Sequence, residues 1–349
     1  MKIAVLVSGG VDSSTALALL KKQGHDVTAF YLKIWLEDEL AFLGNCPWEE
    51  DLNYVEKVCK QFNVPLKVVN LQKEYWKKVV SYALKEVKAG RTPNPDMMCN
   101  LNIKFGDFFK NIDKSFEKVA TGHYADTAIK NKKTLLKKVK DKIKDQTYFL
   151  AHLNQQQVSR ALFPIGNMLK EDVRKLAKKL DLPNKDRKDS QGICFLGKIN
   201  YNDFIKQHLG EKQGNFVDID TKQVLGKHNG YWFYTSGQRK GTHLDQPGPW
   251  YVVSKDTKKN IVYVSRNYDE HKKNIFKVNK LHWIADKPKL NNLKVKLRHG
   301  PKIYKCKIKV LKKDLWEVKI NGNDQGIAPG QFAVFYDDKY CYGCGTIIN

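Results

Sequence analysis

The first third of the chain alternates between short apolar runs and longer stretches in which apolar residues recur at helical spacing. The apolar runs predict strands over residues 3–7, 27–32, 66–71 and 119–122. The stretches between them predict helices from Ser13 to about Gly24, over 51–62 and over 75–88. Largely apolar strands are buried on both faces, and strands that alternate with helices pair in parallel. We therefore expect an α/β domain built on a doubly wound parallel sheet.

From about Lys255 the pattern changes to apolar and basic residues that alternate at period two, as in half-exposed antiparallel strands. Such strands are predicted over residues 260–264, 293–297, 306–310 and 315–320. Turn signals occur at Asn321-Gly322 and Pro329-Gly330. A small C-terminal β-barrel accounts for this pattern. The 349 residues fit three domains, which we place at 1–200, 201–275 (a linking domain) and 276–349.

Residues 7–14, Val-Ser-Gly-Gly-Val-Asp-Ser-Ser, join the first strand to the first helix. A helix N-terminus after a strand aims backbone N–H groups and the positive end of the helix dipole at one point, which suits a phosphate. Adjacent glycines let the backbone approach an anion closely. The stretch lacks the Gly-Lys-Ser/Thr of a Walker A loop and the third glycine of the dinucleotide fingerprint. Phosphate binding is the favoured interpretation, and a plain strand–helix turn is the alternative.

The chain is strongly basic, with 62 Lys and Arg against 37 Asp and Glu and a net charge of +25. Such an excess attracts polyanions, so nucleic acid is the expected partner, although a general enrichment in lysine is an alternative cause. The seven cysteines form no regular framework, and no stretch of eighteen apolar residues occurs. The chain starts on its first strand without a leader-like segment. We expect a cytoplasmic protein with free thiols that does not span a membrane.

Two further stretches combine a cysteine with loop residues. Residues 90–100 carry two prolines, Asp96 and Cys99 just after a predicted helix, and residues 189–196 carry Cys194 next to Phe195. Taken alone, the first resembles a surface turn, and a lone cysteine beside phenylalanine is more often packed in a core. Neither stretch by itself establishes a site.

In combination, these stretches resemble a known family. Residues 8–13 resemble the SGGxDS pyrophosphate-binding loop of the ATP pyrophosphatase superfamily. The whole set, in this order, resembles the tRNA-specific 2-thiouridylase family, which installs sulfur at C2 of the wobble uridine. The supporting blocks are Thr92-Pro93-Asn94-Pro95-Asp96 with Cys99, Lys144-Asp145-Gln146-Thr147-Tyr148-Phe149-Leu150, Gly192-Ile193-Cys194-Phe195, Gly237-Gln238-Arg239-Lys240-Gly241 and Ala328-Pro329-Gly330-Gln331. The chain departs from the commoner family pattern after Cys99 and before Cys194, without loss of a group that the chemistry needs.

The resemblance implies an adenine nucleotide α-hydrolase-like fold, ATP and Mg²⁺ as cofactors, and a reaction that proceeds through an adenylated uridine. It implies that Cys194 carries a persulfide, that Cys99 releases the product by forming a disulfide with Cys194, and that Asp96 is the acid/base group. The implied ATP contacts are Val7, Ser8, Gly9, Gly10, Val11, Asp12, Ser13, Ser14, Leu32 and Gly122. The implied tRNA contacts are Asn94, Pro95, Asp96, His123, Lys144, Asp145, Gln146, Arg298, His299 and Gln331, to which the basic C-terminal segment adds Lys302.

The implied partners are tRNAs with a modifiable wobble uridine, such as those for Lys, Glu and Gln, and a sulfur donor, either a cysteine desulfurase or a relay protein. Two other functions stay open. Another adenylating ligase of the same superfamily would explain the glycine loop but not Cys99 and Cys194. A non-catalytic RNA-binding protein would explain the charge but not the two cysteine loops. Cys341 and Cys344 form a lone CxxC without a second pair at metal spacing, so we do not expect zinc there.

Overall fold

A computed structural model describes residues 1–34, 48–188, 200–242, 244, 249–271, 273–290, 292–324 and 327–348. Cys46, Cys194 and the whole predicted stretch 189–196 lie outside these residues.

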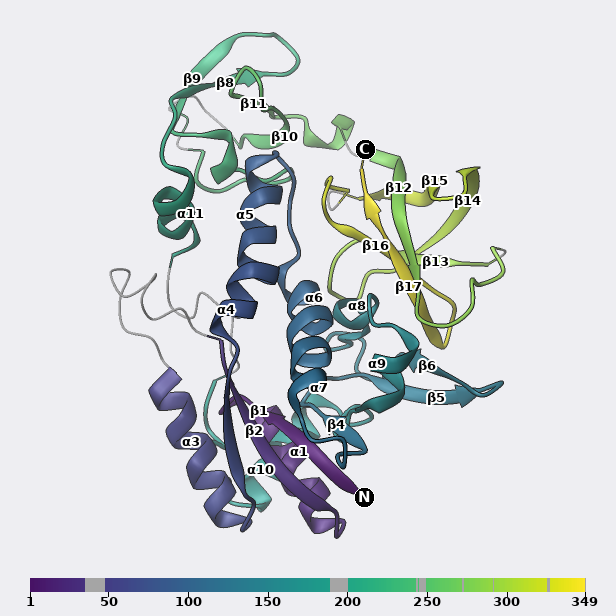
Figure 1. Cartoon of the computed structure of the whole chain (residues 1–349). Coiled ribbons are helices and arrows are strands. Elements are labelled where there is room, and N and C mark those ends of the chain that lie inside the picture. Colours follow the sequence, from purple (N-terminus) through teal and green to yellow (C-terminus); the bar gives the residue numbers. More distant parts are fainter. Residues whose placement is uncertain are drawn as a thin grey trace.

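The N-terminal part is organised around a parallel sheet, as predicted (Figure 1). Its strand order is β3-β2-β1-β4-β7, and each neighbouring pair is parallel. The strands are β1 (Lys2–Val7), β2 (Asp26–Lys33), β3 (Leu66–Asn70), β4 (Lys118–Ala120) and β7 (Ala161–Leu162). Because the order runs outward in both directions from β1, the sheet is doubly wound and the carboxyl end of β1 lies at a position suited to a ligand.

Helices cover both faces of this sheet because β1 is apolar on both sides. Ile3, Val5 and Val7 pack with α1 (Val11–Lys22) and α3 (Trp48–Gln61). Ala4 and Leu6 face the opposite layer. That layer comprises α4 (Gln72–Tyr75), the π-helical η2 (Trp76–Val80), α5 (Ser81–Lys88), α6 (Pro95–Cys99), the π-helical η3 (Asn100–Asp107) and α7 (Phe108–Asn111). Short helices α8 (Thr147–Leu150), α9 (Gln155–Arg160) and α10 (Lys170–Lys179) follow in the chain.

The middle of the chain forms a separate small sheet in the order β10-β11-β8-β9. It comprises α11 (Tyr201–Leu209), β8 (Gly214–Asp218), β9 (Val224–His228), the 3₁₀ turn η4 (Tyr231–Phe233), β10 (Tyr251–Asp256) and β11 (Ile261–Ser265). The strand predicted over 260–264 is therefore β11. It pairs antiparallel with β10, as expected, but parallel with β8, which the alternating pattern did not indicate.

The C-terminal strands close into the predicted antiparallel barrel in the order β12-β15-β14-β13-β16-β17, with β12 paired to β17. They are β12 (Lys273–Trp283), β13 (Lys294–Lys296), β14 (Tyr304–Lys312), β15 (Leu315–Asp324), β16 (Phe332–Tyr336) and β17 (Tyr340–Ile347), preceded by a 3₁₀ turn η5 (Tyr268–His271). The turn predicted at Asn321-Gly322 is wrong, since both residues lie inside β15, where Gly322 has a φ of +91°. Pro329-Gly330 is a turn, as predicted.

A hairpin from the N-terminal part extends the barrel sheet. β5 (Asp126–Lys130) pairs with β6 (Lys133–Lys137), and β6 pairs with β17 at Tyr340 and Cys341. Figure 1 shows this hairpin beside the lower end of the barrel. The stretch from Lys130 to Lys144 is rich in lysine, a pattern typical of a solvated loop. It nevertheless contains β6, and through β6 it joins the two domains. Among the described residues, no helix has both the length and the apolar composition that crossing a bilayer requires.

Candidate active site

The glycine loop leaves β1 and enters α1 with its backbone held in shape by its own hydroxyls. The Ser13 hydroxyl donates to the carbonyl of Gly10 at 3.1 Å and accepts the N–H of Ser8 at 3.2 Å. Gly9 needs its φ of +71°. Among the described residues, a Cβ on Gly10 would meet only the Ser8 hydroxyl within 4 Å, at 3.6 Å. The glycine at position 10 therefore leaves a space at the helix N-terminus that fits an anion.

Two residues far along the chain support the loop from behind. The Asn184 side-chain amide donates to the Gly9 carbonyl at 2.7 Å and to the Ser14 hydroxyl at 2.9 Å. Arg187 also donates to the Gly9 carbonyl, at 3.1 Å, and forms an ion pair with Asp51 of α3. Sequence inspection missed these residues because nothing in their local pattern distinguishes them from a surface turn.

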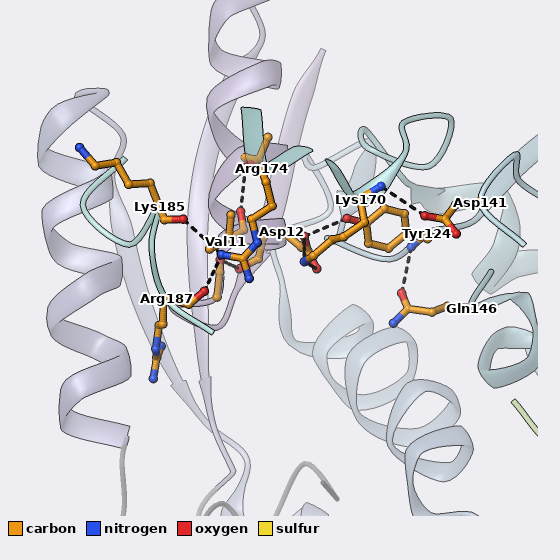
Figure 2. Close-up of polar contacts among 12 residues, drawn as sticks. Val11, Asp12, Tyr124, Asp141, Gln146, Lys170, Arg174, Lys185 and Arg187 are labelled. Atoms are coloured by element: carbon orange, nitrogen blue, oxygen red, sulfur yellow. Dashed lines mark hydrogen bonds and ion pairs between the residues drawn. The ribbon is translucent and has the colours of Figure 1, made fainter. Parts of the chain in front are cut away.

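Asp12 is held by a cation that the sequence did not reveal (Figure 2). The Lys170 ammonium donates to both Asp12 carboxylate oxygens, at 2.7 and 2.9 Å, and the Tyr124 hydroxyl donates to one of them at 3.0 Å. Both Lys170 and Asp12 are partly buried. An aspartate at this position of a phosphate loop could hold a metal ion or cap a backbone group, but the Asp12 carboxylate accepts its hydrogen bonds from this ammonium and this hydroxyl.

The strand end at Gly122 packs directly on the start of α1. A Cβ at Gly122 would lie 2.6 Å from the Ser13 nitrogen, so only glycine fits there. The next residue, His123, pairs its Nδ1 with the Thr121 hydroxyl at 2.8 Å. Burial, followed by the charge of Lys104, lowers the pKa of His123 well below its usual value. The imidazole beside the glycine loop is therefore neutral at physiological pH.

The predicted cysteine loop is folded as a short helix with an N-cap. The Asn94 side chain accepts the N–H of Met97 at 3.1 Å, and Pro95 occupies the first turn, where a missing N–H costs nothing. Cys99 ends this helix and is 1% exposed. Burial raises the pKa of its thiol to about 11; Lys104 acts in the opposite direction, and Asp96 raises the pKa further.

Asp96 and Lys104 relate this helix to the glycine loop. The Asp96 Oδ1 atom is buried and has no hydrogen-bond partner among the described residues. A buried carboxylate oxygen without a hydrogen bond costs free energy, so a hydrogen-bond donor on a bound molecule would stabilise it. The charge of Lys104 acts on both Cys99 and His123. Cys99 and the end of β4, which packs on the glycine loop, therefore lie around a common lysine.

The barrel holds the loop that precedes this helix. The Thr92 N–H donates to the Pro329 carbonyl at 2.8 Å, and the Gln331 side-chain amide donates to the carbonyls of Pro93 at 2.8 Å and Thr92 at 3.3 Å. A Cβ at Gly330 would come within 2.9 Å of the Thr92 oxygen. Two predicted blocks that are more than 230 residues apart in the sequence thus form one structure.

Comparisons with known proteins cover the whole chain. The tRNA methyl transferase HUP domain matches residues 1–198, the PRC-barrel domain of the same family matches 202–266, and an aminomethyltransferase β-barrel domain matches 273–347. A protein from Parabacteroides distasonis named tRNA-specific 2-thiouridylase MnmA is 46% identical, over 100% of this chain and 99% of its own length. The chain belongs to the tRNA-specific 2-thiouridylase family. Proteins of the same name from Bacteroides thetaiotaomicron and Porphyromonas gingivalis are each 45% identical, with 99% of both chains covered.

Other residues that the 2-thiouridylase resemblance assigns to tRNA have structural partners here. Asp145 is buried and accepts hydrogen bonds from the N–H and hydroxyl of Thr147. Gln146 accepts the N–H of Tyr124 at 2.9 Å (Figure 2). The Lys144 N–H donates to Asp141 at 3.0 Å. Their contacts with tRNA stay predictions.

On the barrel side of this family member, His299 packs against Phe149 with ring centroids 4.8 Å apart and ring planes tilted by 32°. Burial, and then Lys296, lower the pKa of His299. Arg298 and Lys302 both face the buried carboxylate of Asp324, at 3.5 and 3.7 Å. Leu32 lies near the end of β2 and packs against the sheet core. Cys341 and Cys344 are buried core residues of β17.

Proposed function

We propose that this chain is an ATP-dependent tRNA sulfurtransferase that converts the wobble uridine of tRNA to 2-thiouridine, releasing AMP and pyrophosphate. The observation that carries the proposal is that Lys104 acts electrostatically on both Cys99 and His123, and His123 follows the glycine that packs on the phosphate loop. Asp96 acts on the same thiol, and its buried Oδ1 has no hydrogen-bond partner among the described residues. The HUP profile is named for methyl transfer, whereas the full-length relatives are named 2-thiouridylases. Methyl transfer does not need a loop that holds pyrophosphate, so the site favours thiolation.

The first step uses the glycine loop. The C2 oxygen of uracil attacks the α-phosphorus of ATP, the bond to the β-phosphate oxygen breaks, and pyrophosphate leaves. Backbone N–H groups around Gly10 and the dipole of α1 bind the departing charge. Lys170 pairs with Asp12 at the same helix terminus, so its ammonium offsets the charge of that carboxylate beside the phosphates. The product is an O-adenylated uracil whose C2 accepts a nucleophile.

The next steps transfer sulfur, and for these Cys194 is the proposed carrier, although it lies outside the described residues. The terminal sulfur of its persulfide attacks C2, and AMP leaves with the C2 oxygen. The Cys99 thiolate then attacks the Cys194 sulfur, breaks the bond to the transferred sulfur and forms a disulfide. The transferred sulfur keeps the electron pair and stays on C2. An external thiol reductant must reduce the disulfide before the next cycle.

Asp96 is proposed as the proton acceptor. A carboxylate near a thiol raises the thiol pKa, so Asp96 does not help Cys99 electrostatically. Its buried Oδ1, which has no hydrogen-bond partner in the part of the chain that the structure describes, is instead suited to accept a proton from the base or from the thiol during the reaction. Cys99 is buried in this structure, so the loop must open before the Cys99 thiolate can attack the Cys194 sulfur.

The remaining parts of the proposal concern partners. The described residues contain no group of three or more His, Cys, Asp or Glu side chains arranged for a metal ion. We therefore infer that Mg²⁺ arrives with the ATP phosphates, where it would neutralise their charge. The proposed tRNA-binding unit is the barrel of residues 276–349, connected through residues 201–275 to the ATP-using unit of residues 1–200. The sulfur donor is a persulfide carrier protein, and the proposed site of action is the cytoplasm.

The decisive experiment is mass spectrometry of tRNA nucleosides after incubation with the protein, ATP, Mg²⁺ and a persulfide source. Wild type is expected to form 2-thiouridine, and Cys194→Ser should form none. Cys59→Ser is the matched control for Cys99→Ser, because Cys59 is also buried and its pKa is also raised to about 11, yet it lies in α3. Absence of 2-thiouridine with wild type, or its normal formation by Cys194→Ser, would refute the proposal.

A further inference from the structure

The loop that precedes Cys99 forms one wall of an aromatic pocket. Its volume is about 220 Å³. Residues from α5, α11, β10 and the segments next to them define the aromatic pocket. They are Ala83 and Val87 of α5, the loop residues Arg91, Thr92 and Pro93, Pro95 at the start of α6, Tyr201, Phe204 and Ile205 of α11, Trp232 of η4, Tyr234 and Thr235 just after it, and Lys255 of β10. Figure 1 shows that α5 and α11 stand side by side, with the middle sheet across their upper ends. The pocket thus lies where all these elements meet.

The size and the walls of the aromatic pocket restrict what it can hold. Sites for whole drug-sized ligands and cofactors usually enclose about 300–1,000 Å³, so this one suits a single ring and its substituents. Tyr201, Trp232 and Tyr234 are all partly exposed, which leaves aromatic surface available. Unpaired RNA bases stack on such surfaces, each worth about 1–3 kcal/mol.

The charged side chains that line the aromatic pocket are cations, Arg91 and Lys255. Lys255 donates to the Tyr234 carbonyl at 2.9 Å, and Arg91 forms a two-point ion pair with Glu86. No Asp or Glu is among the described residues that line the pocket. The pocket therefore accepts an electron-rich ring or a phosphate more readily than a cation.

A turn next to Tyr234 and Thr235 adds two exposed cations. The Gln238 side chain accepts the Thr235 N–H at 3.0 Å and donates to the Lys240 carbonyl at 2.9 Å. These bonds close the turn and leave Arg239 and Lys240 exposed at its tip. The Gly-Gln-Arg-Lys-Gly block, for which the reaction provides no role, thus builds a small basic projection beside the aromatic pocket.

We propose that the aromatic pocket binds one unpaired nucleotide of the RNA substrate, with its base against Trp232 and Tyr234 and its flanking phosphates at Arg239 and Lys240. The proposal rests on the proposed function for the identity of the RNA. Because Thr92, Pro93 and Pro95 also line the pocket, a nucleotide bound there lies one loop away from Asp96 and Cys99. Binding of this nucleotide would set how many nucleotides separate it from the uridine that is modified.

Fluorescence of labelled anticodon stem-loops tests whether a base binds in the aromatic pocket. 2-Aminopurine is placed at each loop position in turn, and binding is measured without ATP. One position other than the wobble base should be quenched by wild type and not by Tyr234→Leu. Tyr263→Leu is the matched control, since Tyr263 lies in β11 of the same sheet and outside the pocket. Thermal melts check that both variants fold.

The salt dependence of RNA binding tests whether phosphates contact Arg239 and Lys240. This test is independent of the variants in aromatic residues. Removing two cations that contact single-stranded phosphates should reduce the slope of log K against log salt by about 1.4. We expect this for Arg239→Gln/Lys240→Gln and not for Lys258→Gln/Lys259→Gln, which removes two exposed lysines from the β10–β11 turn. Equal slopes for the two double variants, or equal quenching by Tyr234→Leu and Tyr263→Leu, would overturn the proposal. So would loss of sulfur-donor binding with unchanged RNA binding. A wild type that binds RNA in this way and forms no 2-thiouridine would refute the proposed function alone.

Discussion

The side-chain amide of Gln331 donates a hydrogen bond to the carbonyl of Pro93 at 2.8 Å, across 238 positions of sequence. Pro93 lies in the loop that leads into the helix of Asp96 and Cys99, and Gln331 precedes the first strand residue of β16. The Tyr148 hydroxyl contacts the same glutamine at 3.4 Å and the barrel carbonyl of Phe332 at 3.1 Å. The barrel therefore sets the position of the cysteine loop.

We predict that Gln331→Ala lowers the rate of 2-thiouridine formation more than it lowers tRNA affinity. The substitution removes the donor to Pro93 and Thr92, so the helix of Cys99 loses its fixed position. The loss of stability should be about 1 kcal/mol, as for a typical hydrogen bond. Single-turnover rates and tRNA binding, measured separately, check this prediction.

Gln155→Ala is the matched control. Gln155 also connects the N-terminal part to the barrel, through bonds from its amide to the carbonyls of Thr134 and Ile284 at 3.0 and 2.9 Å. It does not contact the cysteine loop. A rate loss of equal size in both variants would show that general docking of the barrel, and not the position of the loop, limits the reaction.

The sequence predicted the elements whose causes are local. The apolar run of β1, the glycine turn and the alternating strands of the barrel each follow from residue spacing, and all are present. Pairings set by distant residues were not predictable. Nothing in the pattern of β11 distinguishes its parallel neighbour β8 from an antiparallel one. The lysines in and around β6 likewise conceal a strand, which pairs with β5 on one side and with β17 on the other.

The same limit applies to the site. The glycine loop was predicted because a strand, two adjacent glycines and a helix N-terminus follow one another in the sequence, and this order by itself indicates a phosphate site. Lys170 was missed because its partner Asp12 is 158 positions away. Gln331 was expected to contact tRNA, and its structural role in holding Pro93 could not be read from its own block. Burial of Cys99 was also hidden, because a loop with two prolines suggests exposure.

Gly10→Val should abolish ATP-dependent pyrophosphate release and leave the fold intact. A Cβ at this position has room in the protein, so the valine occupies the space that the pyrophosphate needs. Gly122→Ala provides the contrast, because its methyl would press on the Ser13 nitrogen and destabilise the fold by about 1–3 kcal/mol. Pyrophosphate assays and thermal melts of both variants check the prediction. Normal pyrophosphate release by folded Gly10→Val would place the phosphate elsewhere.

Lys170→Met should raise the KM for ATP by roughly tenfold, the effect of about 1.4 kcal/mol. Without the ammonium, the Asp12 carboxylate stands unpaired near the incoming phosphates and repels them. Asp12→Asn/Lys170→Met removes both charges and should recover part of the loss. Steady-state kinetics over a range of ATP concentrations measure this coupling. A double variant that is worse than Lys170→Met would mean that Asp12 itself binds ATP or its metal ion.

Cys99 should be labelled slowly by iodoacetamide in the free protein and faster in the presence of tRNA and ATP. Burial disfavours the thiolate and raises the pKa to about 11, so at pH 8 only about one thiol in a thousand is ionised, and the labelling rate should rise with pH up to that value. Cys59 is buried to a similar degree, with a similar pKa, and should not respond to the substrates. Mass spectrometry of peptides distinguishes the two thiols.

Asp96→Asn separates electrostatics from catalysis at the same cysteine. Because the Asp96 charge raises the pKa of Cys99, its removal lowers that pKa, and labelling of Cys99 at pH 9 should become faster than in wild type. Formation of 2-thiouridine should nevertheless fall, because the proton acceptor is lost. If the carboxylate served only to keep the helix folded, Cys99 would also label faster, but in step with global unfolding. The same pH series on Cys59, whose pKa owes nothing to Asp96, identifies that case, because unfolding would expose both thiols together.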